Sequence, residues 1–332
     1  MDRLTVLGAG SWGTALAELL AVRGFRVSLW VRKEELRRSI AERRENAAYL
    51  PGVKLPENII AVSSLREALA GSKLILSAIP SHGLRSVFAE AGPFIDDDAV
   101  IVSATKGIEE TTGLTPSGII TDALKGPGRR EIAVLSGPSF AREVSRRLPA
   151  AVCAASASAA AAALVQRVFS TSYFRVYTNS DVLGVELGGA LKNVIAIASG
   201  ISDGLKLGYN ARAALITRGV AEISRLGAAM GARAHTFYGL SGIGDLVLTC
   251  TGPLSRNYSL GAAIAEGKGL DEITGATRMV AEGVRTAKAA QSLAASLEVD
   301  MPITEEVCNV LYAGKHPGEA VMGLMTRGLK SE

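Results

Sequence analysis

The sequence has few of the residues that build disulfide frameworks or metal sites. Its 332 residues include only three cysteines and three histidines. Cys153, Cys250 and Cys308 are odd in number and far apart, with no CxxC pair. This pattern gives neither a disulfide framework nor a zinc site, and it suits a reducing compartment. None of the histidines stands in an HExxH spacing, so no metal is predicted.

The sequence also lacks a convincing membrane span and a strong excess of one charge. The longest apolar stretch, residues 150–165, is mostly alanine interrupted by serines, and alanine contributes little transfer free energy. A strand pattern begins directly after residue 3, which leaves no room for a signal peptide. The net charge of +4 indicates a weak attraction for anions such as phosphates. No nucleic-acid motif is present, so we expect a soluble, cytoplasmic protein without a nucleic-acid partner or membrane span.

The pattern of hydrophobic residues changes at about residue 179. A chain of this length, with 48% hydrophobic residues, favours two domains with a sizeable core. In residues 1–179, strands alternate with helices, which predicts βαβ units and a mostly parallel, doubly wound sheet. Residues 180–332 lack strand-like runs and predict an all-helical domain. The expected strands cover residues 4–7, 26–30, 74–78, 99–103, 132–135, 150–154 and 174–177, and the main expected helices cover 14–23, 34–44, 181–202, 211–230, 256–266 and 286–297.

A glycine-rich turn, Gly8-Ala9-Gly10-Ser11-Trp12-Gly13, lies between the first expected strand and the first helix. GxGxxG alone is weak evidence in a chain with 36 glycines, but this strand–turn–helix context is typical of a dinucleotide site. Gly8 permits the tight turn, Gly10 lets the backbone approach a pyrophosphate, and Gly13 lets the helix pack on the strand. The phosphates then meet free N–H groups at the helix start. The alternative is an ordinary strand–helix turn.

The end of the second strand bears on the choice of cofactor. An NAD-specific protein usually has Asp or Glu there to bind the ribose hydroxyls, whereas an NADP protein often has Arg. Here the strand leads into Arg32 and Lys33, with no acid before Glu34. A guanidinium can hold a 2′-phosphate through paired hydrogen bonds. The sequence therefore favours NADPH, with use of both cofactors left open; a solvated basic pair that opens the next helix is the alternative.

Hydride transfer at an alcohol carbon needs a group that exchanges the hydroxyl proton, and two residues are candidates. His82 follows a strand, but no acidic partner stands beside it, so a helix-opening or loop position is favoured. Lys192 shares one helix face with Gly184 and Gly188, which suggests a face kept bare so that something can approach it. On an otherwise apolar helix this lysine could have a lowered pKa and act as acid and base. A close helix contact beside a lysine that reaches to solvent is the alternative.

Other polar residues predict a site for a small anion between the two domains. Lys106 follows a strand at the carboxyl edge, where doubly wound sheets bind ligands. Ser139 follows another strand and suits the N-cap of the next helix, a role compatible with ligand binding. In the helical half, a glycine-rich turn presents Asp245, and Ser255-Arg256-Asn257 opens a helix. A serine cap, a helix N-terminus, an arginine and an amide form a plausible phosphate cradle, although each is ordinary taken singly.

Several longer motifs carry a resemblance that runs nearly from end to end. They are GAGSWGTALA at 8–17, SATKGIE at 103–109, LSGPSFAREV at 135–144, ELGGALKNVIAIASGISDGL at 186–205, GDLVLTCTGPLSRN at 244–257, MVAEGVRTAK at 279–288 and MPITEEV at 301–307. On these motifs the chain resembles bacterial NAD(P)-dependent glycerol-3-phosphate dehydrogenase. Lys33 and residues 252–254 lie at positions that vary in that family.

The resemblance implies a Rossmann-type domain followed by an all-helical domain, usually in a homodimer. It implies NAD(P)H-dependent reduction of dihydroxyacetone phosphate to sn-glycerol 3-phosphate, which supplies phospholipid synthesis. Lys192 would be the catalytic proton donor and acceptor. The implied substrate site comprises Lys106, Gly137, Ser139, Lys192, Asp245, Ser255, Arg256 and Asn257. The implied cofactor site comprises Gly8, Gly10, Ser11, Trp12, Gly13, Arg32, Lys33, Lys106, Ala141, Arg256, Val280 and Glu282.

Two other functions remain open at this point. A β-hydroxyacid or 6-phosphogluconate type of dehydrogenase shares the two-domain plan and a helical lysine, and it would act on a substrate carboxylate. A redox-sensing regulator would bind NAD(P) without turnover. The set of Lys106, Lys192 and Asp245 argues against a sensor, since a sensor needs no proton donor.

Overall fold

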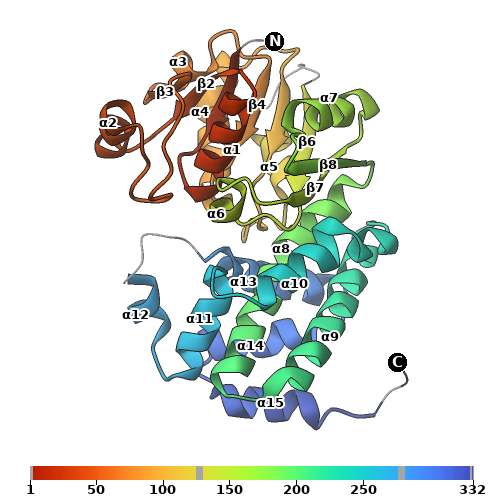
Figure 1. Ribbon diagram of the computed structural model, residues 1–332. Coiled ribbons are helices and arrows are strands. Elements are labelled where there is room, and N and C mark those ends of the chain that lie inside the picture. The colour runs from red at the N-terminus through yellow and green to blue at the C-terminus, as the bar shows by residue number, and fades with distance from the viewer. Residues whose placement is uncertain (1–2, 125–129, 276–280, 330, 332) are drawn as a thin grey trace. The chain divides into compact units, whose positions relative to one another are not determined.

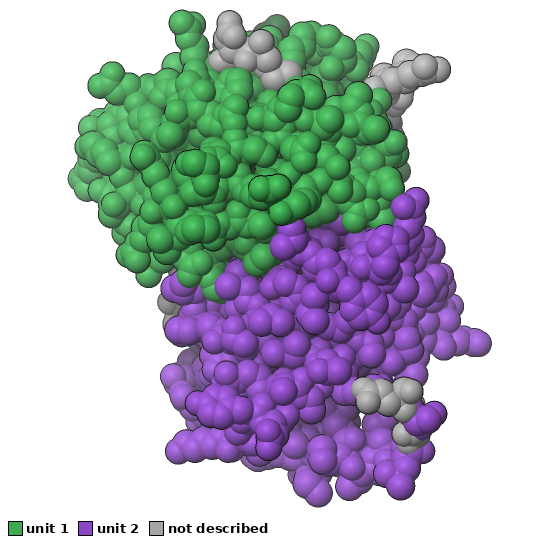
Figure 2. All heavy atoms as spheres, turned by 45° about the vertical axis from the view of Figure 1, so that its right-hand side comes forward, with its two compact units in different colours: residues 1–106, 116–182 green, residues 107–115, 183–332 purple. Residues whose placement is uncertain are grey.

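The computed structural model describes residues 3–124, 130–275, 281–329 and 331 (Figure 1). The chain divides into two compact units, coloured separately in Figure 2. Unit 1 comprises residues 1–106 and 116–182, and unit 2 comprises residues 107–115 and 183–332. The segment 107–115 therefore groups with the second unit, whereas a single boundary after residue 179 assigns it to the first.

One sheet of eight strands is described in unit 1, with the order β3-β2-β1-β4-β5-β6-β7-β8. Neighbouring strands are parallel except for β6 and β7, which are antiparallel. The strands are β1 Arg3–Leu7, β2 Arg26–Trp30, β3 Ile59–Val62, β4 Leu74–Ser77, β5 Val100–Ser103, β6 Glu131–Ser136, β7 Ala150–Ser156 and β8 Phe174–Asn179. The inner strands read as apolar runs because both of their faces are buried. The predicted Rossmann-type, mostly parallel sheet is confirmed; β3 was not expected.

The strand order fixes where a ligand can approach unit 1. The chain builds β2 and β3 on one side of β1 and then crosses to β4 on the other side. The carboxyl ends of β1, β2, β4, β5 and β6 lie at one edge of the sheet, and ligands of such folds bind outside that edge where the strand order reverses. The helices of this unit are α1 Ser11–Val22, α2 Glu34–Arg43, α3 Leu65–Leu69, α4 Ser81–Ala91, α5 Pro116–Ala123, α6 Ala141–Val144 and α7 Ala159–Phe169.

The described part of unit 2 contains helices and no strand, as expected from the sequence. Its helices are α8 Val182–Gly204, α9 Gly208–Ala229, α10 Asp245–Cys250, α11 Arg256–Ala265, α12 Leu270–Gly275, α13 Glu282–Ser296, α14 Pro302–Tyr312 and α15 Pro317–Met325. Two short turns, Ala234–Tyr238 and Leu240–Gly244, precede α10. Helix α8 is long and apolar enough to cross a membrane, but 83% of its most apolar window is buried in the protein. It is the central core helix of this unit.

A buried glutamate joins two helices of unit 2 that are distant in sequence. Glu222 on α9 is 1% exposed. Its carboxylate accepts hydrogen bonds from the backbone N–H groups of Ile303 and Thr304, each at 2.8 Å, and from Thr304 Oγ1 at 2.7 Å. The first N–H groups of a helix have no partner within it, so Glu222 satisfies the start of α14 from outside. This contact holds the C-terminal helices onto α9.

Glu222→Ala should lower the free energy of unfolding by about 3 kcal/mol, because it leaves two buried N–H groups and a hydroxyl without their acceptor. Chemical denaturation followed by circular dichroism measures the change. Glu90→Ala, at an exposed position of α4, should change stability by less than about 0.5 kcal/mol. An equal, small effect of both substitutions would show that the Glu222 cap does not stabilise the protein.

Candidate functional site

The Gly8–Gly13 turn has the backbone that a dinucleotide turn needs. Gly8 has a φ of +109°, and a Cβ there would stand 2.9 Å from the carbonyl oxygen of Ala78. A Cβ on Gly13 would collide with the carbonyl oxygen of Gly8. A Cβ on Gly10, in contrast, would meet no protein atom within 4 Å. Protein packing therefore requires the first and third glycines, whereas the space beside Gly10 is free for a ligand to approach.

The start of α1 is held by a loop that the sequence did not single out. Asn46 is fully buried, and its side-chain amide donates to the carbonyl oxygen of Ala9 at 2.9 Å and to Thr14 Oγ1 at 2.7 Å. Ser11 Oγ donates to the carbonyl oxygen of Tyr49 at 2.6 Å. These contacts fix the turn from the side of the loop, so its N–H groups are oriented before any ligand arrives.

Trp12, the residue expected to contact the dinucleotide, lies partly inside unit 1. Its ring stands 6.4 Å from that of Phe174, and its indole N–H is buried without a partner among the described residues. A buried donor without a partner is unusual in a protein interior and requires an explanation. A bound ligand with an acceptor atom at this point would supply one.

Arg32 and Lys33, predicted to select the cofactor, follow β2 and are exposed. Neither forms an ion pair with a carboxylate in the described part of the chain. Lys33 has extended backbone and directly precedes α2. Two cations without an ion pair therefore follow β2, the strand whose end contacts the adenosine ribose of the dinucleotide in doubly wound folds.

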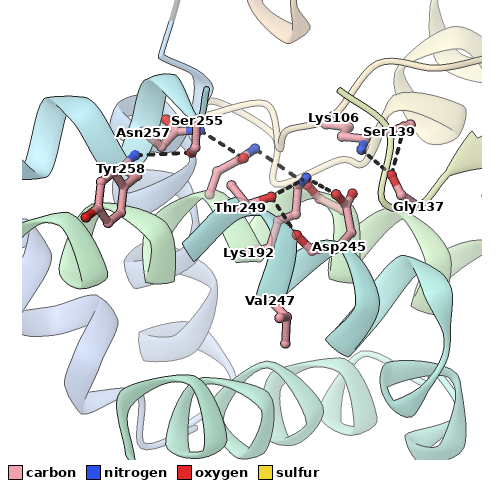
Figure 3. A network of polar contacts seen from close by, with 12 residues as sticks. Lys106, Gly137, Ser139, Lys192, Asp245, Val247, Thr249, Ser255, Asn257 and Tyr258 are labelled. Carbon is pink, nitrogen blue, oxygen red and sulfur yellow. Dashed lines mark hydrogen bonds and ion pairs between the residues drawn. The ribbon is translucent and has the colours of Figure 1, made fainter. Parts of the chain in front are cut away.

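Lys106 and the turn after β6 come together within unit 1 (Figure 3). Lys106 is half-buried, and its Nζ donates to the carbonyl oxygen of Gly137 at 3.4 Å. Gly137 has a φ of +147°, and a Cβ there would stand 2.8 Å from Val152 Cα. The prediction that Ser139 caps the next helix is wrong. Phe140 occupies the cap position of α6 without a side-chain bond, and Ser139 Oγ instead donates to the carbonyl oxygen of Gly137 at 2.9 Å.

The hydrogen bond from Ser139 to Gly137 thus lies within the turn after β6. Ala141, another residue expected at the cofactor, is the first residue of α6 and is half-buried. His82, the other acid–base candidate, is exposed as the second residue of α4. Its position agrees with the helix-opening alternative favoured for it.

In unit 2, Lys192 lies at the centre of a buried polar network (Figure 3). Only 6% of the residue is exposed, and its Nζ forms an ion pair with Asp245 Oδ1 at 2.5 Å. The same Nζ donates to Thr249 Oγ1 at 2.8 Å, and Thr249 in turn donates to the backbone carbonyl of Asp245 at 2.5 Å. Asp245 and Thr249 are one turn apart on α10, so one face of this short helix holds the ammonium group.

The glycines before Lys192 have a different role from the predicted one. A Cβ on Gly188 would stand 2.6 Å from the carbonyl oxygen of Ser241. The turn that leads into Asp245 therefore packs on α8 at Gly188, and the group that approaches this face is the protein's own backbone. The interpretation of a face kept bare for a ligand is wrong at Gly188; the close contact instead brings Asp245 to Lys192.

The residues of the expected phosphate cradle, Ser255-Arg256-Asn257, lie at the start of α11. Ser255 is buried and caps the helix, because its Oγ accepts from the backbone N–H of Tyr258 at 3.2 Å. Arg256, the first residue of the helix, is exposed. The protein packed around its guanidinium lowers the pKa of Arg256, and the charge of Glu282 opposes this shift. Glu282 begins α13. Val280, also expected at the cofactor, lies outside the described residues.

Asn257 is buried and used by the protein itself. Its amide donates to Asn193 Oδ1 at 2.9 Å, and its oxygen accepts from the backbone N–H of Gly283 at 3.0 Å. Asn193 follows Lys192 on α8, so Asn257 links the lysine's helix to the starts of α11 and α13. A positioning role for Asn257 thus accompanies its predicted place at the substrate.

The buried cysteine near this network is not a nucleophile. Burial raises the pKa of the Cys250 thiol to about 12, against the opposing charge of Lys192. A thiol with such a pKa stays protonated at neutral pH and is unreactive. Among the described residues, no group of three or more His, Cys, Asp or Glu side chains could hold a metal.

Two family models together match most of the chain. The family model described as the N-terminus of NAD-dependent glycerol-3-phosphate dehydrogenase matches residues 3–162, and the model of the C-terminus matches residues 181–322. The chain belongs to the NAD-dependent glycerol-3-phosphate dehydrogenase family. The family is one of oxidoreductases, and the resemblance inferred from the motifs is confirmed.

Individual members of the glycerol-3-phosphate dehydrogenase family resemble the chain over its whole length. A glycerol-3-phosphate dehydrogenase [NAD(P)+] of Geobacter sp. (strain M21) is 55% identical over 331 residues, which cover 100% of this chain and 99% of that protein. The solved structure of glycerol-3-phosphate dehydrogenase from Coxiella burnetii has a TM-score of 0.94 at 40% identity, covering 98% and 99% of the two chains. The enzyme structure from Saccharomyces cerevisiae gives 0.82 at 28% identity, with 96% and 98% covered.

Two residues that contact the predicted site residues were missed in the sequence. Thr249 contacts Lys192, and Asn193 contacts Asn257. Asn193 could have been identified from the sequence, since an amide next to a lysine on an apolar helix needs a hydrogen-bond partner. Thr249 gave no signal, because its partner lies 57 residues away in the sequence.

Proposed function

We propose that this chain catalyses the reversible NAD(P)H-dependent reduction of dihydroxyacetone phosphate to sn-glycerol 3-phosphate. The observation that carries the proposal is the buried Lys192, with Asp245 at 2.5 Å and Thr249 at 2.8 Å from its Nζ, in a member of this family. A carbonyl that accepts a hydride at C2 needs a proton on its oxygen, and a fixed ammonium group can deliver it. The glycerol 3-phosphate formed would supply phospholipid synthesis.

The Gly8–Gly13 turn fits a dinucleotide on two observations of this structure. The space beside Gly10 contains no protein atom within 4 Å, and the N–H of Trp12 has no described partner. When bound, the nicotinamide cofactor supplies the hydride or receives it in the reverse reaction. The residues proposed to hold it are Gly8, Gly10, Ser11, Trp12, Gly13, Arg32, Lys33, Lys106, Ala141, Arg256, Val280 and Glu282.

Lys192 would act as general acid in the reduction and as general base in the oxidation. Its ammonium is held in place before the substrate arrives, because Asp245 and Thr249 each occupy one direction around Nζ. From this fixed position the ammonium would donate a proton to a substrate oxygen. Asp245 then acts by orienting Lys192 and balancing its charge.

The phosphate of the substrate would bind where α11 begins. Helix α11 offers backbone N–H groups and the positive end of its dipole, and Arg256 adds an exposed guanidinium. Ser255 and Asn257 fix this helix start through the bonds described above. Lys106, Gly137 and Ser139 complete the proposed substrate residues from unit 1.

We also propose that NADPH is preferred over NADH, because Arg32 and Lys33 stand unpaired at the strand end that reads the ribose. Changing both to Gln should lower kcat/KM for NADPH by about tenfold or more while that for NADH changes little. Steady-state kinetics with each cofactor measures the ratio. Arg26→Gln, exposed at the start of the same strand, should leave the ratio unchanged. An unchanged ratio in the double variant would contradict the preference for NADPH.

The proposed reaction is tested with the purified full chain and a panel of substrates. NADPH consumption should be rapid with dihydroxyacetone phosphate, slow with unphosphorylated dihydroxyacetone, and absent with 3-oxo acids. Rapid turnover of a 3-oxo acid would instead favour the β-hydroxyacid type of dehydrogenase. Tight cofactor binding with no turnover of any substrate would favour the redox sensor.

We further propose that the protein is a cytoplasmic homodimer. Its three cysteines are free and buried, which suits a reducing compartment. Met322 and Met325 on α15 are 60% and 77% exposed, which is unusual for large apolar side chains and suits a subunit contact. Light scattering should give a mass of twice 34.5 kDa. A mass equal to one chain would contradict the homodimer.

A further inference from the structure

Unit 1 contains a pocket that shares no lining residue with the Gly8–Gly13 turn. Its volume is about 410 Å³, and its walls come from three segments of unit 1. Helix α1 contributes Glu18, the loop 51–54 contributes Lys54, and α6 with the turn after it contributes Arg142, Arg146 and Arg147. Helix α6 packs against α1 (Figure 1), and residues of both helices line the pocket together with the loop 51–54. A pocket of this size suits a small molecule.

The pocket carries four cations and one carboxyl group. None of the four cations forms an ion pair in the described part of the chain, although Lys54 Nζ donates to the carbonyl oxygen of Arg43 at 2.9 Å. Elsewhere in this unit, by contrast, Lys73 pairs with both Asp96 and Asp98. Three guanidinium groups and an ammonium that line one pocket without forming an ion pair attract a phosphate, which accepts paired hydrogen bonds from arginine.

Glu18 adds a requirement that a bare phosphate does not meet. The residue is 5% exposed, and its Oε2 is buried without a hydrogen-bond partner among the described residues. Burial raises the pKa of this carboxyl, while the charge of Arg147 lowers it. A buried carboxyl oxygen needs a donor, and a hydroxyl group of a ligand in the pocket would provide one.

Arg147 has a left-handed backbone conformation, which glycine adopts more easily than arginine. Arg147 has a φ of +60°, in the left-handed region, directly after α6. The N–H of Leu148 donates to the carbonyl oxygen of Glu143 at 3.1 Å, which is the bond pattern of a helix end that usually carries glycine. A bulky residue gains nothing from this backbone conformation. Arg147 therefore lines the pocket from a backbone conformation that glycine adopts more easily.

We propose that this pocket binds a small phosphate ester that carries hydroxyl groups, of the sugar-phosphate class. Arg142, Arg146 and Arg147 hold the phosphate, and Glu18 accepts a hydrogen bond from a hydroxyl. The site is separate from the proposed cofactor and substrate residues, and it does not depend on the function proposed above.

Calorimetric titration of the full chain with ribose 5-phosphate tests the site. NADPH is present in excess so that the proposed cofactor site is filled, glycerol 3-phosphate is left out because it is itself a hydroxylated phosphate ester, and ionic strength is held constant. Saturable binding of one ribose 5-phosphate per chain is expected, and ribose alone should not bind. Arg147→Gly and the double variant Arg142→Gln/Arg146→Gln should each weaken binding by about tenfold or more. The melting temperature of Arg147→Gly should not fall, because glycine fits this backbone.

Two controls separate a built site from general attraction of anions. Arg26→Gln/Arg167→Gln removes two exposed charges of the same unit outside the pocket and should leave the affinity within about twofold. Glu18→Gln should weaken ribose 5-phosphate more than inorganic phosphate. The proposal is overturned by absent binding below about 10 mM, or by equal losses in the pocket and control variants. If Glu18→Gln affected the two ligands equally, the proposed hydrogen bond from a ligand hydroxyl to Glu18 would be wrong.

Discussion

Lys192→Met should reduce the turnover number with dihydroxyacetone phosphate and NADPH by about a thousandfold, while the affinity for NADPH stays within a few-fold of that of the unaltered chain. The methionine side chain is unbranched and only one atom shorter than that of lysine, and it has no donor hydrogens. Hydride transfer to C2 would then have to proceed without a fixed proton donor. Stopped-flow and steady-state kinetics measure turnover, and quenching of tryptophan fluorescence measures NADPH binding.

The Lys192 variant needs a control because it also leaves Asp245 buried without its cation. Thr249→Val removes one hydrogen bond to Nζ but keeps the ammonium and the ion pair, and a loss of about tenfold in turnover is expected. Lys268→Met, at an exposed position, should have no effect. Circular dichroism and melting temperatures check that each variant is folded. Near-normal turnover of a folded Lys192→Met would show that another group delivers the proton.

Gly10→Ala and Gly13→Ala should have opposite consequences, although each adds one methyl group to the same turn. Gly10 has extended backbone with a φ of −75°, and an added Cβ meets no protein atom within 4 Å. The variant should fold normally but bind NADPH about a hundredfold more weakly, because the methyl group occupies the space proposed for the pyrophosphate. Gly13→Ala should instead lower the stability by about 3 kcal/mol or prevent folding, since its Cβ collides with the carbonyl oxygen of Gly8.

Calorimetric titration with NADPH and thermal unfolding of both variants measure this contrast. The unaltered chain and Gly24→Ala serve as references; Gly24 has a φ of +92° and no atom near its added Cβ, so only a modest loss of stability is expected there. If Gly10→Ala bound NADPH as tightly as the unaltered chain, the turn would not be where the pyrophosphate lies.

The parts of the structure that depend on neighbouring residues could be predicted from the sequence. The run from β1 through the glycine turn to α1 could be predicted locally. The apolar strand residues, the glycines of the turn and the start of the helix follow one another within a few residues. The cap of α11 by Ser255 is equally local, and both predictions are confirmed. The change from strands to helices near residue 179 also rests on local patterns. Strand β3 was not predicted, although β4 and β5 are equally short and were predicted.

The contacts that the sequence could not show are those between distant segments. Glu222 meets its partners 81 and 82 residues away, and Lys192 meets Thr249 57 residues away. Gly188 looked like a site for a ligand because only the glycine is local, whereas the Ser241 carbonyl that needs the space is not. Ser139 looked like a helix cap, but the turn after β6 takes its hydroxyl for the carbonyl of Gly137. In each case a tertiary contact determined a role that local pattern left open.

The most direct test of the proposed reaction follows the hydrogen itself. The full chain would be incubated with dihydroxyacetone phosphate and NADPH deuterated at C4 of the nicotinamide ring, on one face and then on the other, and the product examined by NMR. We expect sn-glycerol 3-phosphate with deuterium at C2 from one of the two cofactors and hydrogen at C2 from the other. No phosphorylated product, or a product without deuterium at C2 from either cofactor, would contradict hydride transfer to that carbon.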